Sequence, residues 1–347
     1  MISNPTWTTG STSTKAGDIP VLNSRPTLAE TIGGWKARWG IGRMSFRIDP
    51  GLYAVGSPGP DSPVLVTANY KLTFDALRRS IDGLSTWILV LETNGINVWC
   101  AAGEGTFGTA ELVNRILATS LKQVVSHKIV IAPQLGAPGI CAREVAKQAG
   151  FRVVFGPVRA SDISAFLDAG KRATPEMRQV TFDILERAVL IPLELMQALK
   201  YLLTAVVLFV AASGFSRYGF SLESMVTTGI NSALAVLAGG FGGAVMTPLL
   251  LPWIPGRAFA SKGLRAGLIL ALMLTLFHVG GNAGRFETAS WFFIIPAISS
   301  FLAMNFTGAS TYTSLSGVKK EVRTALPLQA AAGVAGILLW LVGRFVS

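Results

Sequence analysis

The sequence predicts an α/β domain with a mostly parallel sheet, followed by an all-α transmembrane bundle of about five helices. In the first half of the chain, short β-rich apolar runs alternate with helical patterns, which is typical of βαβ units. From about residue 190, apolar runs become long enough to cross a membrane. Only 14% of the 347 residues are charged, below the value of about 25% in soluble proteins.

We divide the chain into a disordered or amphipathic segment (1–45), an α/β domain (46–188) and a transmembrane domain (189–347). Residues 1–25 are expected to be disordered. Residues 27–44 carry Trp35 and Trp39 among basic residues and are expected to lie on the domain or on the membrane surface. Strands are predicted at 64–67, 87–91, 128–132 and 152–155, and helices at 74–84, 109–121, 140–150 and 163–169.

The second half is predicted to cross the membrane near 194–214, 226–251, 264–281, 289–306 and 325–343. Basic residues gather in alternate loops, in the groups Lys171, Arg172, Arg178 and Arg187; Arg257, Lys262 and Arg265; and Lys319, Lys320 and Arg323. The other loops and the tail hold only Arg217, Arg285 and Arg344. The positive-inside rule therefore predicts a multi-pass protein of the cell inner (cytoplasmic) membrane, with the N-terminal domain in the cytoplasm and the C-terminus outside.

The net charge of +11 raises the question of nucleic-acid binding. The basic residues flank apolar runs, where they set orientation and meet anionic lipid, so lipid and not nucleic acid is the expected partner. No carboxylate is expected inside a span, and His278 is expected to be packed or interfacial. The bundle is therefore predicted to be an anchor or docking platform and not a transporter. The polar loop 307–316 either docks a partner or simply caps helices.

The densest motif is the run from Ile96 to Thr109, which contains the spacing Gly103-x-Gly105-x-x-Gly108 before a predicted helix. This spacing is found in dinucleotide-binding proteins. The next strand, however, ends in Pro133-Gln134-Leu135-Gly136 and lacks the acidic residue that such sites place there. A nucleotide-binding module remains an alternative.

Cys100 and Cys141 are the two cysteines, too few for a disulfide framework, and they form no CxxC pair. Cys100 precedes the glycine-rich turn and a helix N-terminus, a setting that favours the thiolate, which is a soft metal ligand. Its small neighbours Ala101, Ala102 and Gly103 leave room for a large flat cofactor. The alternative is a small buried apolar residue, and Cys141 is expected to be structural.

The run Asn97-Val98-Trp99-Cys100-Ala101-Ala102-Gly103-Glu104 resembles the signature of the mercury-methylating corrinoid protein family, HgcA. The likeness continues through Gly105-Thr106-Phe107-Gly108-Thr109 and returns at 63–71, 133–137, 156–160 and 304–314. The last stretch is also similar to the large subunits of corrinoid iron–sulfur proteins, which lack the cysteine. Nearly everything after residue 45 takes part.

The resemblance implies a Rossmann-like domain that binds a cobalamin-type, benzimidazole-off corrinoid, with Cys100 as the lower axial ligand of cobalt. It implies a corrinoid-dependent methyltransferase that moves a methyl group from cobalt to Hg(II) and yields methylmercury. Residues that would contact the cofactor, besides Cys100 itself, are Thr67, Asn69, Asn97, Val98, Trp99, Ala101, Ala102, Gly103, Gly105, Thr106, Gly156, Pro157, Val158 and Ala160.

The implied partners are a ferredoxin-like iron–sulfur reductase protein, which returns cobalt to Co(I), and a methyl donor system linked to methyl-tetrahydrofolate. The sequence departs from the signature at Glu104, where the family carries lysine. This reverses a charge beside the expected cofactor and could alter corrinoid contacts, partner docking or the fate of Hg(II). A corrinoid methyl carrier for another acceptor is the second interpretation.

Overall fold

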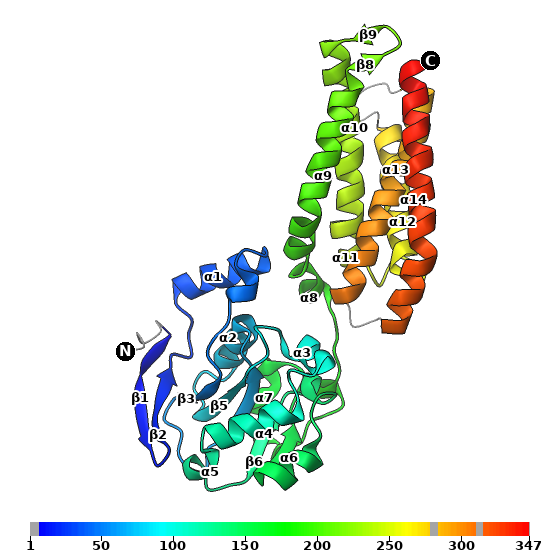
Figure 1. The fold of residues 1–347 in the computed structure, drawn as a ribbon. Coiled ribbons are helices and arrows are strands. Elements are labelled where there is room, and N and C mark those ends of the chain that lie inside the picture. Colours follow the sequence, from blue (N-terminus) through cyan, green and yellow to red (C-terminus); the bar gives the residue numbers. More distant parts are fainter. Residues whose placement is uncertain (1–6, 278–283, 310–314, 347) are drawn as a thin grey trace. The chain divides into compact units, whose positions relative to one another are not determined.

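The chain forms two compact units, residues 1–181 and 182–347, in a computed structural model that describes residues 7–277, 284–309 and 315–346 (Figure 1). The first unit is a mixed, mostly parallel α/β sheet domain, and the second is helical. The fold class predicted from sequence is therefore confirmed.

The α/β unit is built on one sheet with the strand order β1-β2-β3-β5-β4-β6-β7. The strands are β1 (Thr8–Thr14), β2 (Gly17–Leu22), β3 (Gly51–Val55), β4 (Val64–Ala68), β5 (Thr86–Leu91), β6 (Ile129–Ala132) and β7 (Arg152–Phe155). Strands β5, β4, β6 and β7 are mutually parallel, as predicted, whereas β3 pairs antiparallel with β5.

The N-terminal hairpin corrects the expectation of disorder before residue 25. Strands β1 and β2 pair antiparallel, and β2 continues the sheet beside β3. The segment Thr8–Thr14 is polar because it forms the exposed outer strand, which needs few apolar residues. Its four threonines have the branched side chains that favour extended backbone. Low hydrophobicity was therefore a poor guide to disorder here.

Helices cover both faces of the sheet, so the central strands are buried on both sides. Val64, Val66 and Ala68 pack into one core with α4 (Thr109–Ala118) and α6 (Ala142–Ala149), and Leu65 packs into the other. The second core is closed by α2 (Lys71–Ser80) and α7 (Ile163–Asp168). The remaining helices are α1 (Leu28–Arg38), α3 (Val98–Glu104) and α5 (Leu121–Val124), with short 3-10 turns at Arg43–Ser45, Gln134–Gly136 (η2), Ala160–Asp162 and Glu176–Arg178.

Within its described residues, the helical unit holds five helices long and apolar enough to cross a membrane, over Ile184–Ser213, Leu222–Leu249, Phe259–Leu276, Arg285–Asn305 and Ser316–Phe345. The first span comprises α8 (Ile184–Ala188) and α9 (Ile191–Ser213). In the second span, α10 (Leu222–Phe241) continues through a π-helical turn (Gly242–Met246) into α11 (Thr247–Leu249). The last three spans are α12 (Phe259–Leu276), α13 (Arg285–Asn305) and α14 (Leu315–Phe345). A small hairpin, β8 (Phe215–Ser216) and β9 (Gly219–Phe220), joins α9 to α10, and a 3-10 turn, Phe306–Ala309, follows α13. All five predicted spans are thus confirmed as long apolar helices.

Glycines let the three inner helices of the bundle approach closely. A Cβ on Gly267 of α12 would come within 2.6 Å of the Pro296 Cα of α13, and one on Gly243 would reach the Ser299 carbonyl oxygen at 2.5 Å. The apolar windows of the second and fourth spans are each 56% buried, against 11% for the first and 17% for the fifth. The three inner helices, α10, α12 and α13, therefore pack against each other, while few residues of α9 and α14 are fully buried.

Two expectations in this half need comment. Helix α14 begins at Leu315, so the basic cluster of Lys319, Lys320 and Arg323 lies in its first turns and not in a loop. His278 and residues 310–314 of the loop 307–316 lie outside the described residues, so the predictions made for His278 and this loop stay predictions.

Candidate functional site

The candidate site lies at the carboxyl ends of β4, β5, β6 and β7. From β4 the chain crosses to β5 on one side, and later to β6 on the other side of β4, so the sheet has its switch point between β4 and β6. Loops that leave neighbouring strands in opposite directions open a crevice, which is where ligands bind in open parallel sheets. Helix α3 contacts the end of β4 and the η2 turn that follows β6, which places it at this switch point.

Helix α3 carries Cys100 in its first turn. Asn97 is the N-cap, and its side-chain oxygen accepts a hydrogen bond from the Cys100 backbone N–H at 3.0 Å. The helix ends at Gly105, whose φ of 89° is readily adopted only by glycine. Sequence reasoning placed the glycine turn before a helix that follows Cys100. The glycines in fact end the helix that contains the cysteine, and only Gly108 begins the next one.

Asn69, at the end of β4, fixes the loop that precedes α3. Its side chain is fully buried and makes four hydrogen bonds. Nδ2 donates to Oε1 of Glu92 at 2.8 Å, while Oδ1 accepts from the Thr93 N–H at 3.1 Å, the Thr93 hydroxyl at 2.8 Å and the Gly95 N–H at 3.0 Å. Asn69 therefore holds the 92–97 loop at its first two residues and at Gly95. Because this loop leads into α3, Asn69 also fixes where the helix begins.

Glu92 extends this network to the neighbouring helix. Its Oε1 also accepts from the Asn94 N–H, and its own N–H donates to Glu111 of α4 at 2.9 Å. Glu111 in turn forms an ion pair with Arg115 at 2.7 Å. Sequence reasoning missed Glu92, Thr93 and Glu111, because nothing in the local pattern shows that Glu92 and Thr93 bond to Asn69 or that Glu111 bonds to Glu92.

The far end of α3 is held by close backbone contacts. The buried Phe107 N–H donates to the Ala101 carbonyl at 3.0 Å, which closes the turn after the helix. A Cβ on Gly139 would collide with the Phe107 carbonyl oxygen and approach the Ala102 Cα at 3.2 Å. The Thr109 N–H donates to the Gly139 carbonyl at 3.1 Å. Both ends of α3 are thus fixed against the sheet.

The outer side of α3 is exposed to solvent. Cys100 is partly exposed, Trp99 is 37% exposed, and Gly103, Glu104 and Gly105 are exposed. A Cβ on Gly103 would meet no atom within 4 Å. Val98, Ala101 and Ala102 face the core instead. The predicted contact residues of this segment therefore divide into an outward set around Cys100 and an inward set that anchors the helix.

The other predicted contact residues come from two strand ends. Thr67 and Asn69 end β4, and both side chains are buried. Gly156, Pro157, Val158 and Ala160 follow β7, and the Gln134 N–H next to α3 donates to the Pro157 carbonyl at 3.4 Å. Gly156 and Pro157 are buried, whereas Val158 and Ala160 are partly exposed. The fold thus brings all three segments to the same edge of the sheet.

Cys141 lies nearby on the N-cap of α6, where its backbone N–H donates to the Thr109 hydroxyl at 2.8 Å. Its side chain is exposed, so it is no part of the core. Among the described residues, no group of three or more histidine, cysteine and acidic side chains is arranged to hold a metal ion.

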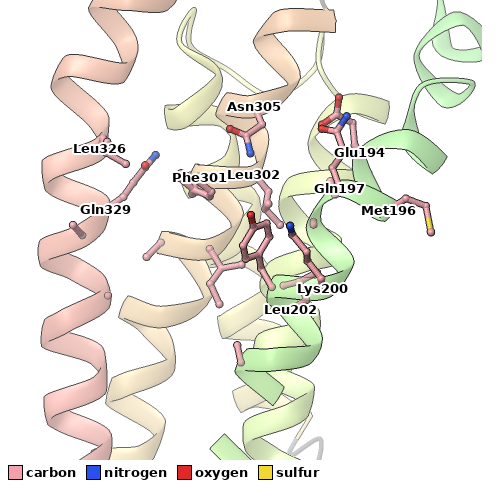
Figure 2. Close-up of a pocket in the computed structure, with 18 residues that line it drawn as sticks. Glu194, Met196, Gln197, Lys200, Leu202, Phe301, Leu302, Asn305, Leu326 and Gln329 are labelled. Carbon is pink, nitrogen blue, oxygen red and sulfur yellow. The ribbon is translucent and has the colours of Figure 1, made fainter. Parts of the chain in front are cut away.

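The bundle contains a cavity of about 1110 Å³. Figure 2 shows Glu194, Gln197 and Lys200 of α9 around it, with Asn305 of α13 and Gln329 of α14, while most of the other lining residues are apolar. Glu194 lies within the first candidate span, so the expectation that no carboxylate falls inside a span is wrong for this residue. The anchor role of the bundle stays a prediction.

Comparison with known proteins relates the α/β unit to subunits of one enzyme complex. Residues 40–167 match the family model described as CO dehydrogenase/acetyl-CoA synthase delta subunit. The gamma subunit of the acetyl-CoA decarbonylase/synthase complex of Archaeoglobus fulgidus is 31% identical over 128 residues, covering 36% of this chain and 27% of that subunit. The gamma subunit of Methanosarcina acetivorans is 32% identical over 168 residues, covering 44% and 33%.

The chain therefore spans between a quarter and a third of the length of these relatives. The match includes β4 to β7, α3 and Cys100, so the candidate site lies inside the related region. The similarity is to a domain of these subunits.

Proposed function

We propose that the α/β unit binds a corrinoid at the carboxyl edge of the sheet and that Cys100 provides the lower axial ligand of its cobalt. The observation that carries this proposal is the position of Cys100. It lies partly exposed on the first turn of a short helix that is fixed at both ends over a switch point of a parallel sheet. The similarity to acetyl-CoA decarbonylase/synthase gamma subunits supports it.

The residues present fit such a cofactor. Cys100 offers one soft ligand, which suits a metal that arrives with its other ligands in a macrocycle. The missing side chain at Gly103 and the exposed Gly105 leave the outer side of α3 flat. Val158 and Ala160, at the β7 end, would contact the cofactor at the same edge of the sheet, and Trp99 offers an exposed aromatic surface beside the ligand.

The chain's own contribution to the reaction is to hold one thiolate still. Asn97 caps the turn that carries Cys100, and Asn69 fixes the loop before it, so the sulfur is presented from a rigid backbone. When bound, the corrinoid supplies a cobalt-held methyl group, and electron donation from a thiolate on its lower face favours departure of that group toward an electrophile.

We propose Hg(II) as that electrophile, with methylmercury as the product. The run Asn97-Val98-Trp99-Cys100-Ala101-Ala102-Gly103 supports this choice, since it resembles the mercury-methylating family. Hg(II) accepts a methyl group together with its bonding electrons, so a strongly donating ligand below the cobalt suits this substrate. A ferredoxin-like iron–sulfur protein would supply electrons, and a methyl-tetrahydrofolate-linked system would supply the methyl group.

The five apolar helices support a place in the cytoplasmic membrane. The basic residues that gather near alternate ends of the apolar helices support a cytoplasmic α/β unit and an external C-terminus. In this arrangement the site would share a compartment with the reductant and the methyl donor.

Reconstitution with cobalamin tests the ligand. The visible spectrum of the loaded full-length protein is expected to change in Cys100→Ala and to remain that of the unaltered protein in Cys141→Ala. Cys141 is the matched control, because it is an exposed cysteine at the start of a neighbouring helix. An unchanged spectrum in Cys100→Ala, or no corrinoid uptake by the unaltered protein, contradicts the proposed site.

A second assay tests the acceptor. With reductant and a methyl donor, the unaltered protein is expected to form methylmercury from Hg(II), and Cys100→Ala is expected to lose this activity. The second candidate is a methyl carrier for another acceptor, favoured by Glu104, which replaces the family lysine on the exposed side of α3. Corrinoid uptake without methylmercury, restored to activity by Glu104→Lys, would favour this candidate.

A further inference from the structure

Helix α1 turns its apolar stripe outward. Leu28, Ile32, Trp35 and Trp39 recur at the spacing of one helix face and are 77, 48, 68 and 43% exposed. The buried positions of the helix are Glu30, Gly34 and Ala37. A helix that covers a soluble domain normally shows the opposite pattern, with its apolar face turned to the core.

The orientation of α1 is fixed by a buried ion cluster. Glu30 accepts from Lys71 of α2 at 2.9 Å and also pairs with Arg78, while Asp75 binds both Lys71 and Arg78. All four side chains are nearly or fully buried. Rotating the apolar stripe inward would break these ion pairs and leave charged side chains buried without a partner, which is costly. The ion pairs therefore fix the apolar stripe on the outer side of α1.

The apolar surface continues past the helix and is bordered by positive charge. Ile41 and Met44 follow Trp39 and are also exposed. Between residues 28 and 47 the basic residues are Lys36, Arg38, Arg43 and Arg47, and the only acidic residue, Glu30, is already paired. We define the α1 surface as Leu28, Ile32, Trp35, Trp39, Ile41 and Met44 with these four basic residues.

We propose that the α1 surface is a second membrane contact of this chain, which inserts its apolar residues into the interface of an anionic lipid leaflet. Tryptophan and basic residues around a shallow apolar stripe are the composition of interfacial helices. Lys36 and Arg47 are exposed and Arg38 and Arg43 are partly exposed, so their positive charges complement anionic head groups. The same chain carries five candidate membrane spans, so a lipid surface is the partner that its own anchor would supply.

The inference does not require corrinoid binding, but it rests on the proposed membrane location. Full-length protein with Cys100→Ala and Cys141→Ala is placed in nanodiscs of equal parts phosphatidylcholine and phosphatidylglycerol. A single spin label is attached at Ile32→Cys, at Lys147→Cys on the exposed side of α6, or at Leu208→Cys on the exposed side of α9. Collision with oxygen, which enters lipid, is compared with collision with a water-soluble nickel chelate.

The oxygen-to-nickel collision ratio at Ile32 is expected to be several-fold higher than at Lys147 and to fall in pure phosphatidylcholine. Adding Lys36→Glu to the Ile32 variant is expected to lower the ratio in the anionic discs. A ratio at Ile32 equal to that at Lys147, with Leu208 in lipid, overturns the proposal. Shielding of Ile32 from both reagents also overturns it, because a protein would then cover the surface. A water-exposed Leu208 would instead refute the membrane location.

Discussion

Replacing Asn69 with leucine is expected to loosen the loop before α3 without altering Cys100, Trp99 or Gly103. The leucine side chain has a similar size but cannot form hydrogen bonds. The change removes the acceptor of the Thr93 and Gly95 backbone N–H groups, both of which belong to buried residues. It also removes the donor to Glu92.

The expected cost follows from these lost partners. A buried N–H left without an acceptor costs about 1–3 kcal/mol, and two such groups are left here. The Thr93 hydroxyl retains the Ile96 carbonyl as a partner, and the buried leucine recovers part of the loss as apolar burial. We therefore expect the loop to lose about 2–4 kcal/mol of protection, which is roughly a 30- to 1000-fold increase in its opening equilibrium.

Hydrogen–deuterium exchange of the full-length protein measures this opening directly. Amides between residues 93 and 101 are expected to exchange faster in Asn69→Leu, while β6 and β7 stay protected. Thr86→Val is the matched control, because Thr86 is a buried polar residue on the adjacent strand whose hydroxyl has no hydrogen-bond partner among the described residues. Its exchange is expected to match that of the unaltered protein.

The reasoning is refuted if Asn69→Leu and Thr86→Val give the same exchange in this loop. It is also refuted if Asn69→Leu unfolds the whole sheet, because the asparagine would then support the core and not the site. A loosened loop should also lower corrinoid uptake, although no group exposed at the site has changed.

Three further predictions concern pH, the site and the bundle. The ionised form of Glu30 is disfavoured by burial, but its bond from the Thr27 N–H and the charges of Lys71 and Arg78 dominate and lower its pKa to about 2. A lowered pKa contributes stability that is present above the unfolded pKa of about 4.5 and is lost as pH falls toward 2, worth about 3 kcal/mol. Acid titration of unfolding should show this loss, and Glu30→Gln should remove it. Gly103→Leu should lower corrinoid uptake at least tenfold without lowering the melting temperature, whereas Gly139→Ala should lower the melting temperature because its Cβ meets backbone. Gly267→Val should abolish the yield of folded protein purified in detergent. Gly333→Val should leave this yield unchanged, because a Cβ at Gly333 would meet no atom within 4 Å.

The central strands could be predicted because they are buried on both faces. Such strands read as continuous apolar runs, as Val64–Ala68 does, and their spacing along the chain reveals the helices between them. The five spans could be predicted for a similar reason, since the membrane imposes a length that few other elements share. Strand β3 was not predicted because its sheet partners, β2 and β5, are distant in sequence. The hairpin before it was not predicted because its outer strand is polar and largely exposed.

The site was predicted less completely than the fold. Cys100 and its neighbours were found through their local run, and the helix predicted after the glycines is present as α4, but the short helix α3 that carries Cys100 and ends at Gly105 was not predicted. The role of Asn69 depends on groups 23 to 26 positions away, which meet it only after β4 and β5 pair. Likewise, the α1 segment was recognised as amphipathic, yet only its pairing with Lys71 and Arg78 shows which side faces outward.

The uneven packing of the bundle has a mechanical consequence. Glycine contacts join α10, α12 and α13 to one another, whereas α14 packs mainly on the single helix α13, through Gly336, and only 17% of its apolar window is buried. When the C-terminus is pulled from a bilayer, we expect α14 to leave first at low force, with the inner three helices resisting as one unit. The anchor would then fail in steps, and its last stable intermediate would be the glycine-packed core.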